Sequence, residues 1–203
     1  MKDYSKLSNS EGEILVKTAR AVVTEFLRTK NKLKLEKKFQ EDFSENAGVF
    51  VTLNHEANLR GCIGYPLPDK KLWNALEDAA ISAATEDPRF PSVTVEELEK
   101  ITFEITILTT PKEIIVSEPQ EYLSKIKVGR DGLIVKSGFN SGLLLPQVPK
   151  EYGWNEEQFL EHTCMKAGLS KDQWKDDNTK ILKFEGIIFK EVLPNGNIER
   201  VEL

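Results

Sequence analysis

Apolar side chains recur at helical spacing near the start of the chain. Repeats of three and four residues place side chains on one helix face, so the pattern predicts an amphipathic helix over residues 11–28. Ser10 and Glu13 have the spacing of a capping box and are expected to start it. The helix is expected to pack through its apolar stripe, which contains Leu15, Ala19, Val22, Val23 and Phe26.

Further along, apolar and polar residues alternate, as expected of strands with one buried face. Residues 49–53 and 59–63 flank turn residues at 54–58 and predict a β-hairpin. Residues 101–109 give the clearest strand, with Glu104 in the middle of its polar face.

Helical and strand segments follow one another without a regular βαβ alternation. Asp69 is expected to cap a helix that ends near Thr85, and two strands are expected to flank the turn at 129–132. Asn155 and Gln158 predict a second capping box. These patterns favour an α+β fold with mainly antiparallel sheets and flanking helices.

Composition narrows the class of protein. The chain has 203 residues and a net charge of −5, so a polyanion such as nucleic acid is not an expected partner. It has neither an apolar leader nor a run of apolar residues long enough to span a membrane, which predicts a cytoplasmic protein without membrane contact. The two cysteines, Cys62 and Cys164, are then expected to be thiols.

The run Arg60-Gly61-Cys62-Ile63-Gly64 combines a thiol with a guanidinium between two glycines. Strand alternation would place Arg60 and Cys62 on one face, where the guanidinium could lower the pKa of the thiol and favour a nucleophilic thiolate. The alternative is a plain strand with a buried cysteine. A base would be needed, and the candidates are Glu104 and the turn residue His55.

Metal and nucleotide sites find no support in the sequence. His162 and Cys164 are two apart on a predicted helix and therefore point in different directions. The chain contains no Cys-x-x-Cys pair, no Walker loop and no Gly-x-Gly-x-x-Gly fingerprint. No cofactor is expected.

Several longer strings carry a family resemblance. LRGCIG at 59–64 and DPRFP at 87–91 are followed, in order, by ITFEITILTTP, VGRDGLIV, SGLLLPQV and TCMKAGL. Together they resemble the AMMECR domain family over about residues 11–189.

The resemblance implies one AMMECR-type domain over 1–203, built as two unequal lobes that form a cleft near the motif. It also implies a role as protein A of the AmmeMemoRadiSam system, with Memo-like and radical-SAM proteins as partners, and no reaction is established for the family. Carried onto this sequence, the functional positions are Arg60, Gly61, Cys62 and Gly64, followed by Asp87, Arg89 and Phe90.

Two functions remain open at this point. The first is binding of a small anionic ligand or a protein partner, with Arg60 and the backbone amides around Gly61 and Gly64 as donors. The second is an enzyme or enzyme component that uses the Cys62 thiolate. The first ranks higher, because no convincing base accompanies the thiol.

Overall fold

The computed structural model describes residues 3–56 and 58–201, and the chain divides into two compact units. The first unit runs through Thr109 and resumes at Ile187, and the second unit is Thr110–Gly186. The fold is α+β, and the strand pairings described below are antiparallel, as the sequence predicts. In the part of the chain that is described, no helix is both long and apolar enough to cross a bilayer.

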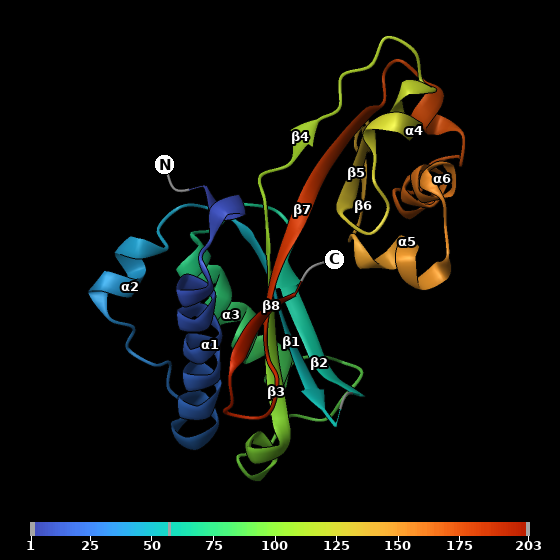
Figure 1. Ribbon diagram of the computed structural model, residues 1–203. Coiled ribbons are helices and arrows are strands. Elements are labelled where there is room, and N and C mark those ends of the chain that lie inside the picture. The colour runs from blue at the N-terminus through green and yellow to red at the C-terminus, as the bar shows by residue number, and fades with distance from the viewer. Residues whose placement is uncertain (1–2, 57, 202–203) are drawn as a thin grey trace. The chain divides into compact units, whose positions relative to one another are not determined.

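The first unit is built on strands in the order β2-β1-β3-β7, with β8 paired to β7 (Figure 1). The last part of β7 belongs to this unit and its first part to the second unit. The elements of the first unit are η1 (Tyr4–Lys6), α1 (Asn9–Thr29), α2 (Lys37–Asp42), β1 (Gly48–His55), β2 (Asn58–Tyr65), α3 (Leu72–Thr85), η2 (Glu96–Lys100), β3 (Ile101–Leu108), β7 (Lys180–Glu191) and β8 (Ile198–Val201).

Helix α1 confirms the predicted amphipathic pattern but begins earlier than expected. Ser8 is the N-cap: its side chain accepts from the Glu11 amide, and the Glu11 carboxylate accepts from the Ser8 amide at 2.8 Å. The predicted box of Ser10 and Glu13 is therefore wrong, because the pair two residues earlier satisfies the first amides.

Helix α3 starts at Leu72 without the predicted Asp69 cap. Its N-cap is Lys71, which makes no side-chain capping bond. The first amides instead donate to loop carbonyls, Leu72 to Glu45 at 2.9 Å and Trp73 to Phe43 at 3.2 Å. A tertiary contact thus does what a capping side chain would do.

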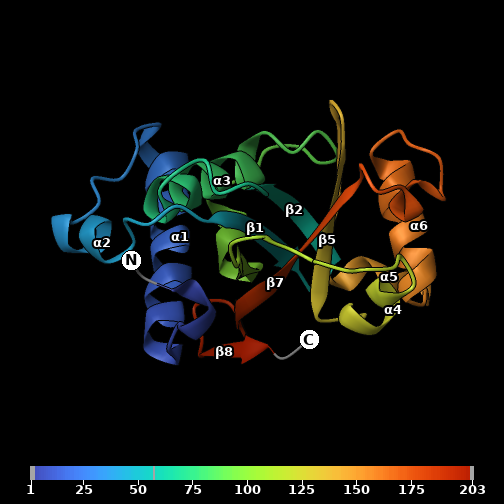
Figure 2. The same ribbon diagram turned by 90° about the horizontal axis from the view of Figure 1, so that it is seen from above.

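One face of the sheet in the first unit carries the buried hydrophobic residues of β3. Ile101, Phe103, Ile105 and Ile107 of β3 are all fully buried, as the alternation predicts, and α1 and α3 pack side by side in the same core (Figure 2). Glu104 lies between them in sequence and points to the opposite face. We call that face, which carries Cys62, Thr52 and Glu104 in neighbouring strands, the polar face.

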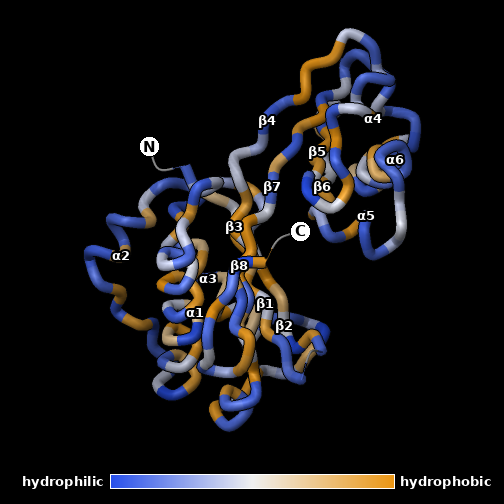
Figure 3. The backbone as a smooth tube through the Cα atoms, in the orientation of Figure 1, coloured by the Kyte–Doolittle hydropathy of each residue, from blue (hydrophilic) through white to orange (hydrophobic). Residues whose placement is uncertain are grey.

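The second unit has its own core, in which strands from its small sheet pack against α6. The Asn155–Gln158 capping box at the start of α6 is confirmed. Hydrophobic residues concentrate along β5 in Figure 3. The elements of this unit are β4 (Lys112–Glu113), α4 (Glu121–Lys125), β5 (Asp131–Ser137), β6 (Asn140–Leu144), α5 (Gln147–Tyr152), α6 (Glu156–Lys166) and η3 (Gln173–Lys175).

One predicted hairpin of the second unit is wrong. The turn at 129–132 is preceded by α4 and a loop, and β5 begins within it at Asp131. The hairpin instead joins β5 to β6 around Gly138, whose φ of +58° suits glycine. Both sites carry turn residues, so the sequence pattern alone did not distinguish them.

Candidate functional site

The two glycines of the motif strand β2 are required by close packing. A Cβ atom at Gly61 would lie 2.1 Å from the Ala83 carbonyl oxygen of α3, and one at Gly64 would lie 2.4 Å from the Val49 oxygen. Neither backbone atom can move without displacing its element. Glycine therefore lets α3 lie directly on β2.

Asp87 ties the loop after α3 to the motif strand. Its Oδ2 atom accepts from the Cys62 backbone amide at 2.8 Å, while Oδ1 accepts from the Arg89 amide at 3.1 Å. The Arg89 guanidinium grips the same carboxylate through Nε at 2.9 Å and Nη2 at 2.7 Å. These donors, with Arg89 first, hold the pKa of the buried Asp87 carboxyl well below its usual range.

Arg60 makes contacts that alternation did not predict. The register between β1 and β2 shifts between Leu53 and Asn54, so Arg60 is an extra residue in a β-bulge. Its Nε and Nη2 atoms donate to the Glu97 carboxylate at 3.0 and 3.1 Å, and Nη1 donates to the Pro91 carbonyl at 2.8 Å.

The guanidinium of Arg60 is therefore committed to the loop and not to the thiol. Only 13% of the side chain is exposed, and Arg60 lowers the pKa of Glu97. The alternation that places Arg60 beside Cys62 does not carry through a bulge, because the extra residue redirects the side chain. Arg60 is suited to position the loop.

Cys62 is half-buried on the polar face. It lies directly opposite Thr52 of β1, whose hydroxyl donates to Sγ at 3.3 Å. The Cys62 amide points away from β1 to Asp87, so the two residues form a non-hydrogen-bonded pair, in which cross-strand side chains are closest.

Glu104 completes a row across three strands, since Thr52 pairs with Cys62 on one side and with Glu104 on the other. Burial raises the pKa of the Glu104 carboxyl, and Lys190 opposes the shift. No described residue donates a hydrogen bond to it. With a whole strand between Glu104 and Cys62, its role as a base for the thiol stays a prediction.

Arg89 and Phe90 form the outer surface of the loop. The Arg89 side chain is 53% exposed although Asp87 orients it, and Nη2 also lies 3.4 Å from the Cys62 carbonyl. Two guanidinium carbons lie near the centroid of the Phe90 ring, that of Arg89 at 5.5 Å and that of Arg60 at 6.0 Å. Six of the residues singled out by the sequence are thus connected: Arg60, Gly61, Cys62, Asp87, Arg89 and Phe90.

The remaining candidates lie elsewhere. Cys164 is fully buried in the second unit, where burial raises the pKa of its thiol to about 11. His162 stacks on Trp154 with ring centroids 3.8 Å apart, and His55 ends β1. Over residues 3–56 and 58–201, no group of three or more His, Cys, Asp or Glu side chains could hold a metal ion.

Sequence reasoning missed the two residues that complete these contacts. Thr52 was only a position in a predicted strand, and no motif singled out Glu97 as a functional residue. Their contacts with Cys62 and Arg60 depend on strand register and loop path. A polar residue opposite the cysteine in the predicted hairpin was the one available signal for Thr52.

Comparison with known proteins supplies the family. The family model described as AMMECR1 matches residues 16–189 of this chain. The chain belongs to the AMMECR1 family. Protein MJ0810 of Methanocaldococcus jannaschii is 53% identical over 194 residues, which cover 95% of this chain and 96% of that protein.

Two further relatives are similar to this chain over nearly its whole length. Protein PYRAB00100 of Pyrococcus abyssi is 48% identical over 204 residues, covering 98% of this chain and 99% of that protein. The crystal structure of uncharacterized protein PH0010 from Pyrococcus horikoshii matches with a TM-score of 0.83 and 47% identity, covering 100% and 99% of the two chains.

Proposed function

We propose that this AMMECR1-family protein binds a small anionic ligand beside the motif strand, with Arg89 as the anchoring residue. The observation that carries the proposal is that Asp87 fixes the Arg89 guanidinium in two places while 53% of the side chain stays exposed. An oriented guanidinium loses little freedom when it binds a carboxylate or phosphate.

Asp87 does not occupy all the hydrogen-bond donors of the Arg89 guanidinium. Nε and Nη2 bind the carboxylate, whereas Nη1 has no hydrogen bond to any described residue. Asp87 neutralises part of the charge, so the expected affinity for a simple anion is modest. Selectivity for the anion would come from hydrogen-bond geometry, because a guanidinium can donate two parallel hydrogen bonds to a carboxylate or a phosphate.

Arg60 has a different role in this proposal from the one the motif suggests. Its guanidinium holds Pro91 and Glu97 and so fixes the loop that presents Arg89 and Phe90. Arg60 is a positioning residue, and Gly61 and Gly64 bring α3 and β1 close to the strand.

A matched pair of variants tests the proposal. In the second unit Arg130 binds Asp131 through Nε at 2.7 Å and Nη2 at 2.9 Å and is 44% exposed, which parallels Arg89 and Asp87 except that Arg130 also lies 3.6 Å from Glu185. Inorganic phosphate and sulfate are titrated by calorimetry against the full chain, Arg89→Gln and Arg130→Gln. Arg89→Gln is expected to weaken binding at least tenfold and Arg130→Gln to leave it unchanged; equal affinities in all three proteins would refute the site.

The resemblance also suggests that the anion could be an acidic group on a Memo-like or radical-SAM protein. Co-purification of such a partner with the wild type and its loss with Arg89→Gln, without any phosphate effect, would favour a protein ligand. If Arg89→Gln still co-purified with the partner, the surface around Arg89 would not be the site of the interaction.

A second candidate function, thiol chemistry at Cys62, is supported by the contrast between the two cysteines. Cys62 is half-buried and its Sγ is oriented by Thr52, whereas Cys164 is fully buried with a raised pKa. We expect iodoacetamide to label Cys62 in the folded protein and Cys164 only after denaturation, with Cys62→Ser as the control. Equal protection of both thiols would exclude this function.

A further inference from the structure

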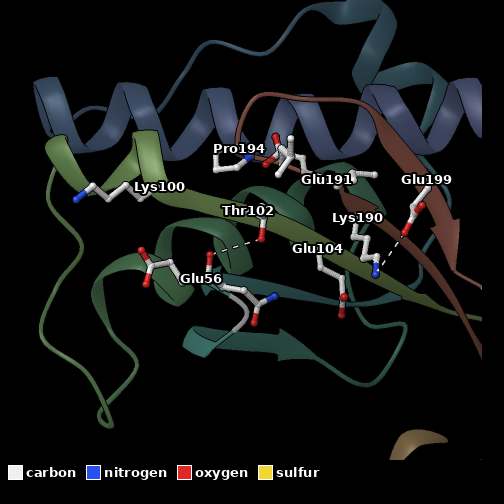
Figure 4. A pocket seen from close by; sticks show the side chains of 11 residues that line it. Glu56, Lys100, Thr102, Glu104, Lys190, Glu191, Pro194 and Glu199 are labelled. Atoms are coloured by element: carbon white, nitrogen blue, oxygen red, sulfur yellow. Dashed lines mark hydrogen bonds and ion pairs between the residues drawn. The ribbon is translucent and has the colours of Figure 1, made fainter.

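The first unit contains a cavity of about 620 Å³ that the motif strand does not line. It lies over the polar face, between β3, the β7–β8 hairpin and the end of β1 (Figure 4). Its volume is within the usual range for small-molecule sites. Its lining includes Glu104, Thr102 and Asn54 from the strands, and Leu193 and Pro194 from the loop between β7 and β8.

Two of the acidic side chains around this cavity already have cationic partners. Glu191 is buried, pairs with the Arg20 guanidinium and accepts from the Phe103 amide at 3.0 Å. Glu199 pairs with Lys190 at 3.3 Å, and Figure 4 shows the two side chains pointing toward one another. The negative charges of these two carboxylates are therefore balanced by cationic side chains.

Glu104 and Glu56 are the lining carboxylates that form no ion pair with a described residue, and Glu104 is the less exposed of the two. It is half-buried and receives no hydrogen bond from any described residue. The Lys190 amine, whose positive charge acts on Glu104, is bound to Glu199. Desolvation without pairing is costly for a carboxylate, and a cationic group in the cavity would relieve that cost.

The loop between β7 and β8 favours a ligand with an aliphatic part. Leu193 and Val192 follow the end of β7 with 67% and 52% of their surface exposed, although both are hydrophobic. Both line the cavity together with Pro194. Methylene groups packed against them would remove apolar surface from water.

We propose that this cavity binds a small organic ammonium ion, a primary amine on a short aliphatic chain, with Glu104 accepting from the ammonium group and Leu193 contacting the chain. Glu56 adds a second carboxylate at the cavity edge, and Lys100 and Lys190 limit how much positive charge is tolerated. One ammonium group therefore suits the site better than a polycation. The proposal does not depend on Arg89 or on Cys62.

The test uses n-pentylammonium as the probe and 1-pentanol as its neutral counterpart. Both are titrated into the full chain, Glu104→Gln and Glu113→Gln by calorimetry, with circular dichroism to verify folding. Glu113 controls for the loss of one carboxylate away from the cavity, because it lies in the second unit, where it is exposed and pairs with Lys180. We expect saturable binding of the amine that is at least tenfold weaker in Glu104→Gln, unchanged in Glu113→Gln, and absent for the alcohol.

Leu193→Ser provides an independent readout that leaves the carboxylate intact. It is expected to weaken n-pentylammonium severalfold and to leave methylammonium, which lacks the chain, unaffected. Equal affinity in the wild type and folded Glu104→Gln, equal binding of amine and alcohol, or no saturable binding of the amine would overturn the proposal.

Discussion

The side chain of Asp87 accepts a hydrogen bond of 2.8 Å from the backbone amide of Cys62, which lies 25 residues earlier in the chain. This contact joins the LRGCIG strand to the DPRFP loop. The two strings that most suggested a functional centre are therefore one structural assembly. Asp87 holds it together, and Arg89 and Phe90 form its surface.

Replacing Asp87 with Asn should weaken this assembly. The variant keeps the size of the side chain but loses the charge that receives two bonds from Arg89. We expect the free energy of unfolding to fall by about 2 kcal/mol at pH 7, measured by urea denaturation. Asp172→Asn, at an exposed ion pair, is the control and should change it little.

Asp87→Asn should also remove part of the pH dependence of the free energy of unfolding. The pKa of Asp87 is lowered in the folded state, so its contribution is present above the ordinary carboxyl pKa of about 4 and is lost as pH falls toward the folded value. The difference in free energy of unfolding between the wild type and Asp87→Asn should become smaller below pH 4. A gap that is constant from pH 7 to pH 3 would contradict the ionic role.

Arg60→Lys should not preserve the contacts of Arg60. A lysine ammonium cannot bind both Glu97 oxygens and the Pro91 carbonyl in the fork geometry of a guanidinium. We expect a loss of about 1 kcal/mol in the free energy of unfolding and faster hydrogen exchange around Phe90. If Arg60→Lys showed the hydrogen-exchange rates of the wild type around Phe90, a positive charge alone would be enough to hold the loop.

Gly61→Ala should be strongly destabilising. The new methyl group would lie 2.1 Å from the Ala83 carbonyl oxygen, so α3 or β2 must shift. Overpacking of this kind should cost about 3 kcal/mol, seen as a lower urea midpoint. Leu59→Ala, at a side chain with 40% exposure in the same strand, should cost much less. Equal losses would refute the packing explanation.

Glu104→Gln should stabilise the protein at neutral pH. Burial raises the folded-state pKa of Glu104, so the stability that this group contributes is present below its unfolded pKa of about 4.3 and is lost as pH rises. Removing the ionisable group should raise Tm by about 2–4 °C at pH 7. The difference should disappear near pH 4, and Glu113→Gln should show no such pattern.

Local chemistry explains which elements the sequence could predict. The Asn155–Gln158 capping box and the alternation of β3 are properties of a few neighbouring residues, and both are confirmed. Where two local signals compete, prediction fails: Ser8 with Glu11 and Ser10 with Glu13 both have capping spacing, and the structure uses the first pair. The Asp69 cap failed because loop carbonyls satisfy α3.

The sequence by itself determined the fold class, the antiparallel hairpin of β1 and β2, and the family, because periodicity and the strings that resemble the family can be read along the chain. Only the tertiary structure decided where the Arg60 guanidinium points, since a single extra residue in β2 moved it from the thiol to Glu97. It also brought Glu104 into a cavity with Lys190, more than eighty residues away. The place of a bulge and the path of a loop depend on long-range packing, which the alternation of neighbouring residues does not encode.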